Sequence, residues 1–248
     1  MKSLVVLILS TFSLMAMSGE ELAVKVDAVT EGFIDSKSIS TMTLFNANGV
    51  KSERRMRMSR LEGKNGDRSM IVFETPSDIK STALLTYEHF DKDDDQWIYL
   101  PALKRVKRIA SKNKSGSFMG SEFSYEDLSS QKRFKYSYED EDEVVEKDNM
   151  LITKRVPNDR YSGYSKQVVY VDAKSFLVQK IEYYDRKKEL LKRALFKDYK
   201  KIKDVWRFGN IDMVNLQTKK RTVILVTDEN LKNGLREKDF TKRYLKQQ

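Results

Sequence analysis

Alternation of apolar and polar residues with a period of two runs through most of this chain and limits the folds open to it. Segments of roughly five to ten residues alternate in this way, and clusters of turn-forming residues separate them. Met56 and Met58, for example, alternate with Arg55 and Arg57. The pattern predicts a series of strands, each with one apolar face and one face in water.

The predicted strands follow one another along nearly the whole chain. Asn48-Gly49 joins the first two, and this dipeptide is the strongest short signal for a hairpin. Pro101 divides a later segment into two short pieces. The predicted strands lie at residues 38–49, 51–63, 67–76, 82–90, 96–109, 133–145, 150–157, 166–173, 176–185, 189–202, 206–215 and 221–229.

Helical spacing occurs in few places, chiefly residues 18–33 and 235–245. Parallel neighbours in a sheet need long crossover connections, usually helical. We therefore predict a mainly β fold, an antiparallel sheet of about 11–12 strands that curls on itself because strands twist. A concave apolar face of such a sheet needs a cover, and space left beneath the cover can hold a ligand.

The first residues have the form of a secretory signal peptide. Lys2 precedes the apolar run Leu4–Met17, and cleavage is expected after Ser18. An uncleaved membrane anchor is the alternative, but it needs roughly 20 apolar residues, and this run is shorter and contains serine and threonine. We expect residues 1–18 to be a signal peptide and residues 19–248 to be a single domain in the periplasm, not membrane-spanning after cleavage.

Charge and cysteine content narrow the partners of an exported chain. The formal net charge is +10 and there is no cysteine, so neither a disulfide nor a lipid-modified cysteine can form. A basic chain usually raises nucleic acid as a partner, but export makes that partner unexpected. Anionic lipid head groups or acidic protein surfaces fit the charge better.

Familiar catalytic and metal-binding patterns are incomplete in this sequence. His89 is the only histidine, which excludes a zinc site built from several histidines. A catalytic triad that uses a histidine is not supported by the residues around His89. Asp91, Asp93 and Asp95 have the first spacings of an EF-hand loop, but Gln96 stands where the loop needs glycine, and its final glutamate is missing. We expect an acidic hairpin turn there, and no enzyme, metal or cofactor.

Residues 108–128 differ in composition from the strands around them. Glycines and serines permit tight turns, and here they surround aromatic and methionine side chains. Ser124 and Asp127 form an S-x-x-D pattern that can start a short helix. We predict that this segment lies over the mouth or the concave face of the sheet as a plug or lid; the alternative is a loop held to the core by its aromatic residues.

The same region carries a resemblance to a known family. The matching elements are Trp97–Pro101, Lys104–Ile109, Gly116–Ser121 and Phe123–Leu128, with a weaker match at Asp204–Phe208 and Ile211–Met213. With these motifs the chain resembles the bacterial outer-membrane lipoprotein-sorting proteins, relatives of the LolA/LolB-type carriers. The resemblance implies a half-open LolA-like barrel capped by a few short helices, and members of the family are often associated with RND-type exporters.

A function follows from this resemblance as an expectation. The chain is expected to be a periplasmic, non-enzymatic carrier that binds the acyl chains of a lipoprotein or a free lipid in an apolar cavity. It is expected to transfer them toward the outer membrane, with an RND-type inner-membrane exporter as a partner. The alternative is an accessory subunit of an exporter that binds protein and has no lipid cargo of its own.

Candidate binding residues come from the predicted strand faces and from residues 108–128. Methionine adapts to varied apolar partners, so the methionines of the strands are candidates for lipid binding along with the large apolar residues. The candidates for lipid binding are Met56, Met58, Met70, Val72, Leu84, Trp97, Tyr99, Phe118, Met119 and Phe123. The candidates for contact with head groups or a partner are Lys104, Arg105, Lys107 and Arg108.

Overall fold

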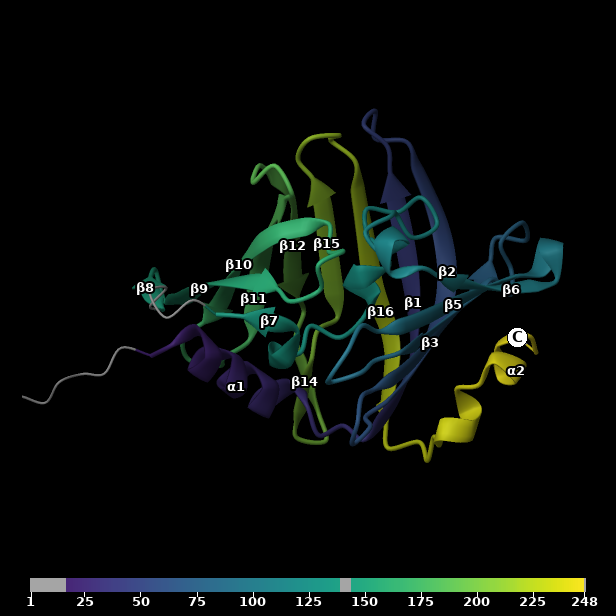
Figure 1. Cartoon of the computed structure of the whole chain (residues 1–248), viewed down its shortest axis with the longest axis horizontal. Coiled ribbons are helices and arrows are strands. Elements are labelled where there is room, and N and C mark those ends of the chain that lie inside the picture. Colours follow the sequence, from purple (N-terminus) through teal and green to yellow (C-terminus); the bar gives the residue numbers. More distant parts are fainter. Residues whose placement is uncertain (1–16, 139–143, 248) are drawn as a thin grey trace, which may run out of the picture.

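The computed structural model of the chain describes residues 17–138 and 144–247 and is built on one large, curved antiparallel sheet (Figure 1). The apolar run expected to form the signal peptide falls mostly outside the described residues, as does the acidic run at residues 139–143. Within the described part, fourteen strands form this sheet and two more form a separate hairpin. The predicted mainly β, antiparallel fold is confirmed, with more strands than predicted.

The strands and helices follow the order expected for a chain of hairpins. The strands are β1 (Asp35–Phe45), β2 (Lys51–Leu61), β3 (Arg68–Thr75), β4 (Ala83–Tyr87), β5 (Asp95–Leu100), β6 (Arg105–Ile109), β7 (Tyr136–Ser137), β8 (Val145–Lys147), β9 (Met150–Pro157), β10 (Tyr164–Asp172), β11 (Val178–Asp185), β12 (Leu190–Lys197), β13 (Lys200–Ile202), β14 (Val205–Arg207), β15 (Asn210–Asn215) and β16 (Arg221–Leu231). The helices are α1 (Gly19–Thr30) and α2 (Lys242–Leu245), with short 3-10 helices η1 (Pro101–Leu103), η2 (Ser111–Asn113), η3 (Glu126–Leu128), η4 (Arg133–Lys135) and η5 (Glu237–Asp239).

Strand order explains why one long connection is needed. The order in the sheet is β6-β5-β4-β3-β2-β1-β16-β15-β12-β11-β10-β9-β7, with β8 paired to β9. Strands β6 and β7 are consecutive in the chain but lie at opposite ends of this order. The chain between them, residues 110–135, therefore has to pass from one edge of the sheet to the other, and we call it the crossing segment.

Local signals in the sequence account for several element boundaries. The β1–β2 hairpin turns at Asn46–Val50, where Gly49 has a φ of +80°, a conformation that glycine adopts without steric cost. Helix α1 begins with a capping box, in which the Ser18 side chain accepts from the Glu21 N–H and the Glu21 carboxylate accepts from the Ser18 N–H. Cleavage after Ser18 would remove this cap, since Ser18 itself supplies it.

Two predicted strands differ in the structure. Of the predicted strand 133–145, residues 139–143 lie outside the described part of the chain; residues 133–137 form the 3-10 helix η4 and the two-residue strand β7, and Val145 is the first residue of β8. The chain arrives there at the end of the crossing segment, so it pairs with the outermost strand over only two residues. The predicted strand 189–202 is divided at Asp198, which has a φ of +56°, into β12 and β13.

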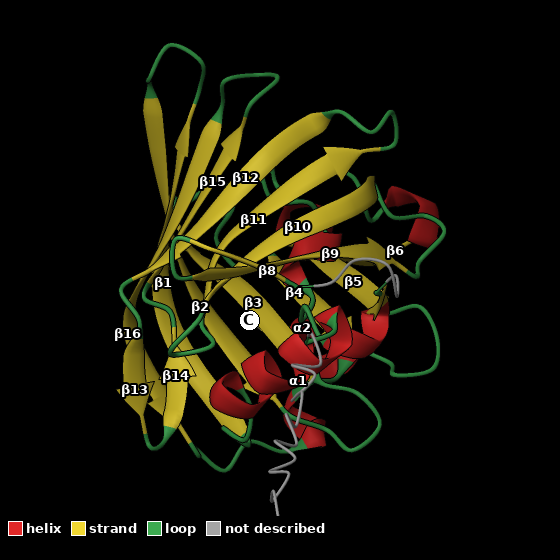
Figure 2. Ribbon diagram, turned by 90° about the vertical axis from the view of Figure 1, so that its left-hand side faces the viewer, coloured by secondary structure: helices red, strands yellow, loops and turns green. Residues whose placement is uncertain are grey.

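The curvature gives the sheet two different faces. Ile98 of β5 and Leu151 of β9 lie far apart in the strand order, yet both belong to one continuous buried cluster. This is possible because the sheet curves around that cluster, and we call this concave side the inner face. Figure 2 shows the curved sheet with α1 lying across its open side. On the opposite, outer face, the C-terminal residues cover β3, β4 and β5.

Candidate functional site

The inner face carries the largest apolar cluster of the molecule, and the crossing segment closes it. Of the predicted lipid-binding residues, Met56, Leu84, Phe118 and Phe123 are buried in this cluster. Met58 and Met119 are partly buried and pack against it. The structure thus brings together predicted residues from β2, β4 and the crossing segment. Leu22 of α1 completes the cover from another side.

Four predicted lipid-binding residues lie elsewhere. Met70, Val72 and Trp97 are buried in the outer-face cluster, and Tyr99 packs against it. Successive side chains of a strand point to opposite faces, so Met70 and Val72 point away from their neighbour Ile71, which belongs to the inner face. The predicted set therefore does not form one surface, because in β3 to β5 both faces are apolar and alternation cannot distinguish them.

The predictions from sequence missed the far half of the inner face. These residues come from strands that follow the crossing segment or from β1, and they face the same cluster as Met56. The signal for these residues is the period-two alternation of their strands, which puts them on one face of the sheet. They are Met42, Leu151, Tyr164, Val169, Val171, Ile181, Tyr183, Ala194, Met213 and Ile224.

The middle of the crossing segment forms a tight hairpin of its own. Ser117 and Ser124 pair as an antiparallel bridge, and the Phe118 N–H donates to the Phe123 carbonyl at 2.7 Å. The Phe118 side chain is 1% exposed and stacks on Phe73 of β3, with ring centroids 5.6 Å apart. The predicted position over the concave face is confirmed, and the aromatic residues hold the segment to the core at the same time.

Strands from both halves of the sheet hold the crossing segment through hydrogen bonds. The Arg54 guanidinium of β2 donates to the Met119 carbonyl at 2.6 Å, and the Gln96 amide of β5 donates to the Tyr125 carbonyl at 2.9 Å. From the other half, the Thr222 hydroxyl of β16 accepts from the Glu122 N–H at 3.0 Å. Contacts to both halves make the segment a bridge across the inner face.

A buried ion pair is a further attachment of the crossing segment. The Lys192 ammonium of β12 donates to Asp127 at 2.6 Å, and the two side chains are 5% and 4% exposed. Asp127 also accepts from the Tyr164 hydroxyl at 2.8 Å and from the Ser124 N–H at 2.6 Å. Ser124 and Asp127 bond to each other as the S-x-x-D pattern predicts, but the N-cap of η3 is Tyr125 and no side chain caps this helix. The Asp127 carboxylate is instead bonded to the sheet through Lys192.

Glu126, beside this pair, has a raised pKa. Its carboxylate accepts from the Ser162 hydroxyl at 2.7 Å and from the Gly163 N–H at 2.9 Å. Burial raises the pKa of Glu126 to about 7, and the neighbouring Asp127 carboxylate adds to the rise, against the opposing effect of these hydrogen bonds. The attachment of the crossing segment to this half of the sheet therefore changes its charge near neutral pH.

The end of the crossing segment is anchored by a second buried carboxylate. Glu88, at the end of β4, accepts from the Ser130 N–H at 2.8 Å and from the Lys135 ammonium at 3.0 Å. Lys135 also donates to Asp94 at 2.8 Å. Burial acts to raise the pKa of Glu88, but Lys135 and Arg60 hold this pKa well below its usual range. Glu88 is therefore charged throughout the physiological range.

Free volume lies at three places around the inner face. A pocket of about 470 Å³ lies where the hairpin of the crossing segment meets β10, the β11–β12 turn and β12, lined by Phe123, Tyr164 and Lys192 among others. A cavity of about 30 Å³ lies between α1 and the inner face, lined by Leu22, Val26, Val169 and neighbouring residues. A third pocket of about 390 Å³ lies where the loop after β4, the end of the crossing segment and the β9–β10 turn meet, and its lining is largely polar. Between these spaces, the chain's own side chains fill the apolar cluster of the inner face.

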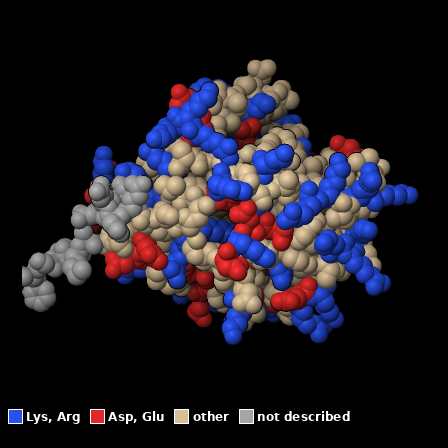
Figure 3. Space-filling view, in the orientation of Figure 1, with Lys and Arg blue, Asp and Glu red and all other residues tan. Residues whose placement is uncertain are grey.

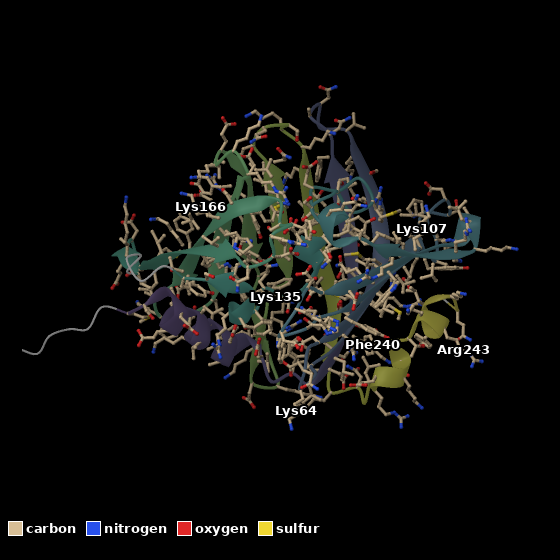
Figure 4. All side chains as sticks on the ribbon, in the orientation of Figure 1. Lys64, Lys107, Lys135, Lys166, Phe240 and Arg243 are labelled. Atoms are coloured by element: carbon tan, nitrogen blue, oxygen red, sulfur yellow. The ribbon has the colours of Figure 1, made fainter. Side chains whose placement is uncertain are left out.

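The basic residues predicted to contact head groups or a partner lie at an edge of the sheet. All four are exposed, and Lys107 projects from the β6 end of the sheet (Figure 4). Figure 3 shows Lys and Arg side chains gathered over the same end of the molecule. Arg105 and Lys107 are on the side of Leu100 and Ile98, whereas Arg108 points to the other side and pairs with Asp95. We call Lys104, Arg105, Lys107 and Arg108 the basic edge.

The acidic turn before β5 has a structural explanation. The Asp95 carboxylate pairs with Arg108 and contacts the His89 ring at 3.1 Å, while Asp91 and Asp93 are exposed. In residues 17–138 and 144–247, no three His, Cys, Asp or Glu side chains are grouped so that they could hold a metal ion. Among the same residues, none of the helices has the length and apolar character needed to cross a membrane.

Proteins of known structure share this architecture. A family model described as an uncharacterized protein matches residues 65–247, while among curated proteins no match is found. The crystal structure of a domain described as outer membrane lipoprotein-sorting, from Vibrio parahaemolyticus, is 44% identical with a TM-score of 0.85, over 92% of this chain and 98% of that one. A DUF1329 family protein from Desulfovibrio piger is 30% identical with a TM-score of 0.85, over 92% and 97%.

A more distant structure shares the fold. A LolA superfamily protein from Nitrosomonas europaea is 19% identical with a TM-score of 0.74, over 92% of this chain and 100% of that one. The curved open sheet and its short helices are common to these structures. The resemblance first read from residues 97–128 extends in this way over nearly all of the chain. The chain belongs to the family of the outer membrane lipoprotein-sorting protein domain from Vibrio parahaemolyticus and the DUF1329 protein from Desulfovibrio piger.

Proposed function

We propose that this protein is a non-enzymatic periplasmic carrier that binds lipid acyl chains, of a lipoprotein or a free lipid, between the inner face and the crossing segment, for transfer toward the outer membrane. One observation carries the proposal: the crossing segment lies over the apolar inner face, and its own Phe118 and Phe123 fill that face. The printed description of the Vibrio relative, lipoprotein sorting, supports the same reading.

Energetics set what the inner face has to supply. Burying an acyl chain contributes roughly 0.8 kcal/mol per methylene, so a chain of about fifteen methylenes gains on the order of 12 kcal/mol. Ligand pockets usually measure roughly 300–1,000 Å³, whereas the cavity beneath α1 measures about 30 Å³. Pockets of about 390 and 470 Å³ lie beside the crossing segment, but Phe118 and Phe123 fill the apolar cluster itself. A cargo chain that binds in that cluster takes their place by displacing the crossing segment.

The first experiment measures binding directly. Delipidated protein is titrated with a fluorescent fatty acid, and protein purified from the periplasm is extracted for lipid mass spectrometry. We expect saturable binding and co-purified lipid. Absence of both would contradict the carrier function. The proposal assigns no catalytic step to the chain.

A disulfide can test whether the crossing segment has to move. The Glu122 N–H and the Thr222 hydroxyl oxygen are 3.0 Å apart, which puts the two Cα atoms at most about 7 Å apart, at the limit of disulfide geometry. The chain has no cysteine of its own. We expect the oxidised Glu122→Cys/Thr222→Cys protein to lose fatty-acid uptake and to recover it on reduction.

A matched control keeps the disulfide but frees the segment. Ser117 and Ser124 pair within the crossing segment, so Ser117→Cys/Ser124→Cys cross-links the hairpin without tying it to the sheet. This variant is expected to take up fatty acid in both redox states. Equal uptake by the oxidised Glu122→Cys/Thr222→Cys protein would show that cargo does not enter beneath the crossing segment.

The exported state and the basic edge belong to the same proposal. Residues 1–18 are removed as a signal peptide, residues 19–248 form the carrier domain, and the basic edge contacts anionic head groups or an RND-type exporter. Strand β6 is an outermost strand of the sheet and carries exposed cations beside Leu103, which is 55% exposed. Each cation near an anionic membrane contributes about 1 kcal/mol.

The exposed basic edge also favours a second candidate function, an accessory subunit that docks on an exporter and carries no lipid. Replacing Lys104, Arg105, Lys107 and Arg108 together by alanine separates the two. If the chain is an accessory subunit, the variant loses its partner in a pull-down while fatty-acid uptake is absent from both proteins. If it is a carrier, uptake from solution persists in the variant.

A further inference from the structure

Strand β6 is the outermost strand at one end of the sheet, and one of its sides is unpaired. Within residues 17–138 and 144–247, β6 pairs with β5 on one side and with no strand on the other. At the opposite end of the sheet, β7 and β8 pair with the two ends of β9. An outermost strand presents backbone N–H and C=O groups to which a further strand can bind. We call the unpaired side of β6 its free edge.

The side chains of β6 give the free edge a regular pattern of charge. Arg105 and Lys107 lie on one side of the strand, and Val106 lies between them on the other side. Arg105 and Lys107 are exposed, and within the described part of the chain neither has an acidic partner. Arg108, on the side of Val106, is paired with Asp95. A strand that approaches the free edge therefore meets two unpaired cations at a period of two, with an apolar side chain between them.

This pattern decides which kind of strand the free edge can accept. Like charges directly opposite each other on neighbouring strands are destabilising, whereas opposite charges are favourable. Two copies of β6 placed edge to edge would bring cations together, and charged residues on an edge strand commonly prevent such pairing. A strand with carboxylates facing Arg105 and Lys107 and an apolar residue facing Val106 is complementary at all three positions.

A membrane is a poorer match to the free edge than a peptide is. Anionic lipid head groups attract lysine and arginine near the bilayer surface. Head groups cannot, however, continue the ladder of hydrogen bonds between β5 and β6, because that ladder needs a further backbone in extended conformation. The unpaired backbone and the alternating charges together therefore favour a peptide strand.

We propose that the free edge of β6 binds an extended acidic segment of a partner protein by strand addition, with carboxylates at alternate positions facing Arg105 and Lys107. In strand addition, backbone hydrogen bonds supply affinity and alternate side chains supply specificity. The inference rests on the part of the proposed function that assigns a partner to the basic edge, and it names the chemistry of that partner. Strand β6 continues directly into the crossing segment, so the partner strand binds next to the cover of the inner face.

Three peptides test the requirements for backbone pairing and for alternation. The delipidated protein is titrated with acetyl-Glu-Val-Glu-Val-Glu-amide, with a peptide of the same composition in the order Glu-Glu-Glu-Val-Val, and with the alternating peptide N-methylated at every residue. N-methylation removes the N–H donors of the peptide and leaves its charge unchanged. We expect the alternating peptide to bind about tenfold more tightly than either of the others. Equal binding of the alternating and N-methylated peptides would overturn the inference.

Two double variants test the residues of the free edge. Arg105→Ala/Lys107→Ala should weaken binding of the alternating peptide about fivefold or more, because the facing carboxylates lose their partners. Lys219→Ala/Lys220→Ala is the matched control, since both lysines are exposed in the β15–β16 turn and the same charge is removed. This control should bind the peptide as wild type does. Equal weakening in the two variants would mean that net charge alone attracts the peptide, and the inference would be wrong.

Hydrogen exchange locates the bound peptide on the unaltered protein, so this measurement does not depend on the folding of a variant. Amides of residues 105–109 that point away from β5 should exchange more slowly when the alternating peptide is bound. Exchange that stays unchanged in these residues at saturating peptide would place the binding site elsewhere and would also overturn the inference.

Uptake of a fluorescent fatty acid, measured on the same protein, keeps the inference separate from the carrier function. Uptake without binding of any peptide overturns the inference and leaves the carrier function standing. Binding of the alternating peptide at β6 without uptake supports the inference and contradicts the carrier function. Binding of vesicles that contain phosphatidylglycerol, dependent on Arg105 and Lys107 and without peptide binding, would assign the edge to a membrane and overturn the inference.

Discussion

At the residue scale, the buried charges of the crossing segment matter more than the many exposed ones. Removing one partner of a buried ion pair leaves the other charge uncompensated, which costs about 3–5 kcal/mol. Lys192→Met should therefore lower the free energy of unfolding by this amount, because Asp127 stays buried. Urea unfolding monitored by tryptophan fluorescence measures the change.

The control for Lys192→Met is an exposed pair on β2. Lys51 and Glu53 are 3.1 Å apart with side chains 62% and 55% exposed, and such pairs contribute about 0–1 kcal/mol. Lys51→Met should therefore leave stability nearly unchanged. Equal effects of the two substitutions would mean that the Lys192–Asp127 pair does not hold the crossing segment.

Glu126 predicts a pH dependence. Its pKa is raised from 4.5 to about 7 in the folded protein, so the folded state binds this proton more tightly than the unfolded state. The stability that Glu126 contributes is fully present below pH 4.5 and is lost as the pH rises through 7, by up to roughly 3 kcal/mol. Glu126→Gln should lessen the fall in stability between pH 5 and pH 8.

Asp27 also contributes to the fall in stability with pH, and it does so equally in wild type and in Glu126→Gln. Burial raises the pKa of Asp27 to about 6, which lowers stability over part of the same pH range in both proteins. The difference between wild type and Glu126→Gln therefore reports Glu126 alone. Parallel stability curves for the two proteins from pH 5 to pH 8 would refute a raised pKa at this residue.

At the element scale, the crossing segment is both a cover and part of the core. If residues 108–128 acted only as a lid, replacing Phe118 and Met119 by serine would change lipid uptake more than stability. For Phe118, 1% exposed, this is now unexpected, since removing a buried aromatic ring costs about 3–5 kcal/mol. Met119 is only partly buried and has a φ of +52°.

The two substitutions should therefore separate. Phe118→Ser should lower the midpoint of urea unfolding strongly. Met119→Gly should change it little, since glycine adopts the left-handed conformation without strain and this offsets the lost contacts. A large loss of stability in Met119→Gly would show that the tip of the segment is packed more tightly than its exposure indicates.

At the scale of the whole molecule, the part of the sheet formed by β3 to β5 is buried on both sides. The C-terminal residues make this possible, because Phe240 and Leu245 are fully buried against Met70, Val72, Leu85 and Trp97. In Figure 4, Phe240 lies next to this part of the sheet. Burial of the apolar outer face of β3 to β5 therefore depends on the short segment that contains Phe240 and Leu245.

Shortening the chain tests this dependence. Removal of residues 236–248 should expose the outer-face cluster, raise the fluorescence of the dye ANS and lower stability. Phe240→Ala alone should cost about 3–5 kcal/mol, whereas Leu225→Ala, at a side chain that is 44% exposed, should cost little. Unchanged dye binding and stability of the shortened protein would contradict the role given to the C-terminal segment.

The sequence by itself determined the features that depend on near neighbours. Period-two alternation identified most strands, and Asn48-Gly49 identified the first hairpin. These signals act over a few residues, so no distant contact is needed to produce them. The family motif in residues 97–128 likewise lies within one continuous stretch.

Only the tertiary structure decided which strands are neighbours and which face is the inner one. The position of β6 and β7 at opposite edges forces residues 110–135 across the sheet, and no local pattern contains that information. Met70 and Trp97 were predicted for the wrong face because both faces of their strands are apolar. Lys192 and Asp127 meet across 65 residues, since a buried charge takes its partner from wherever the fold brings one.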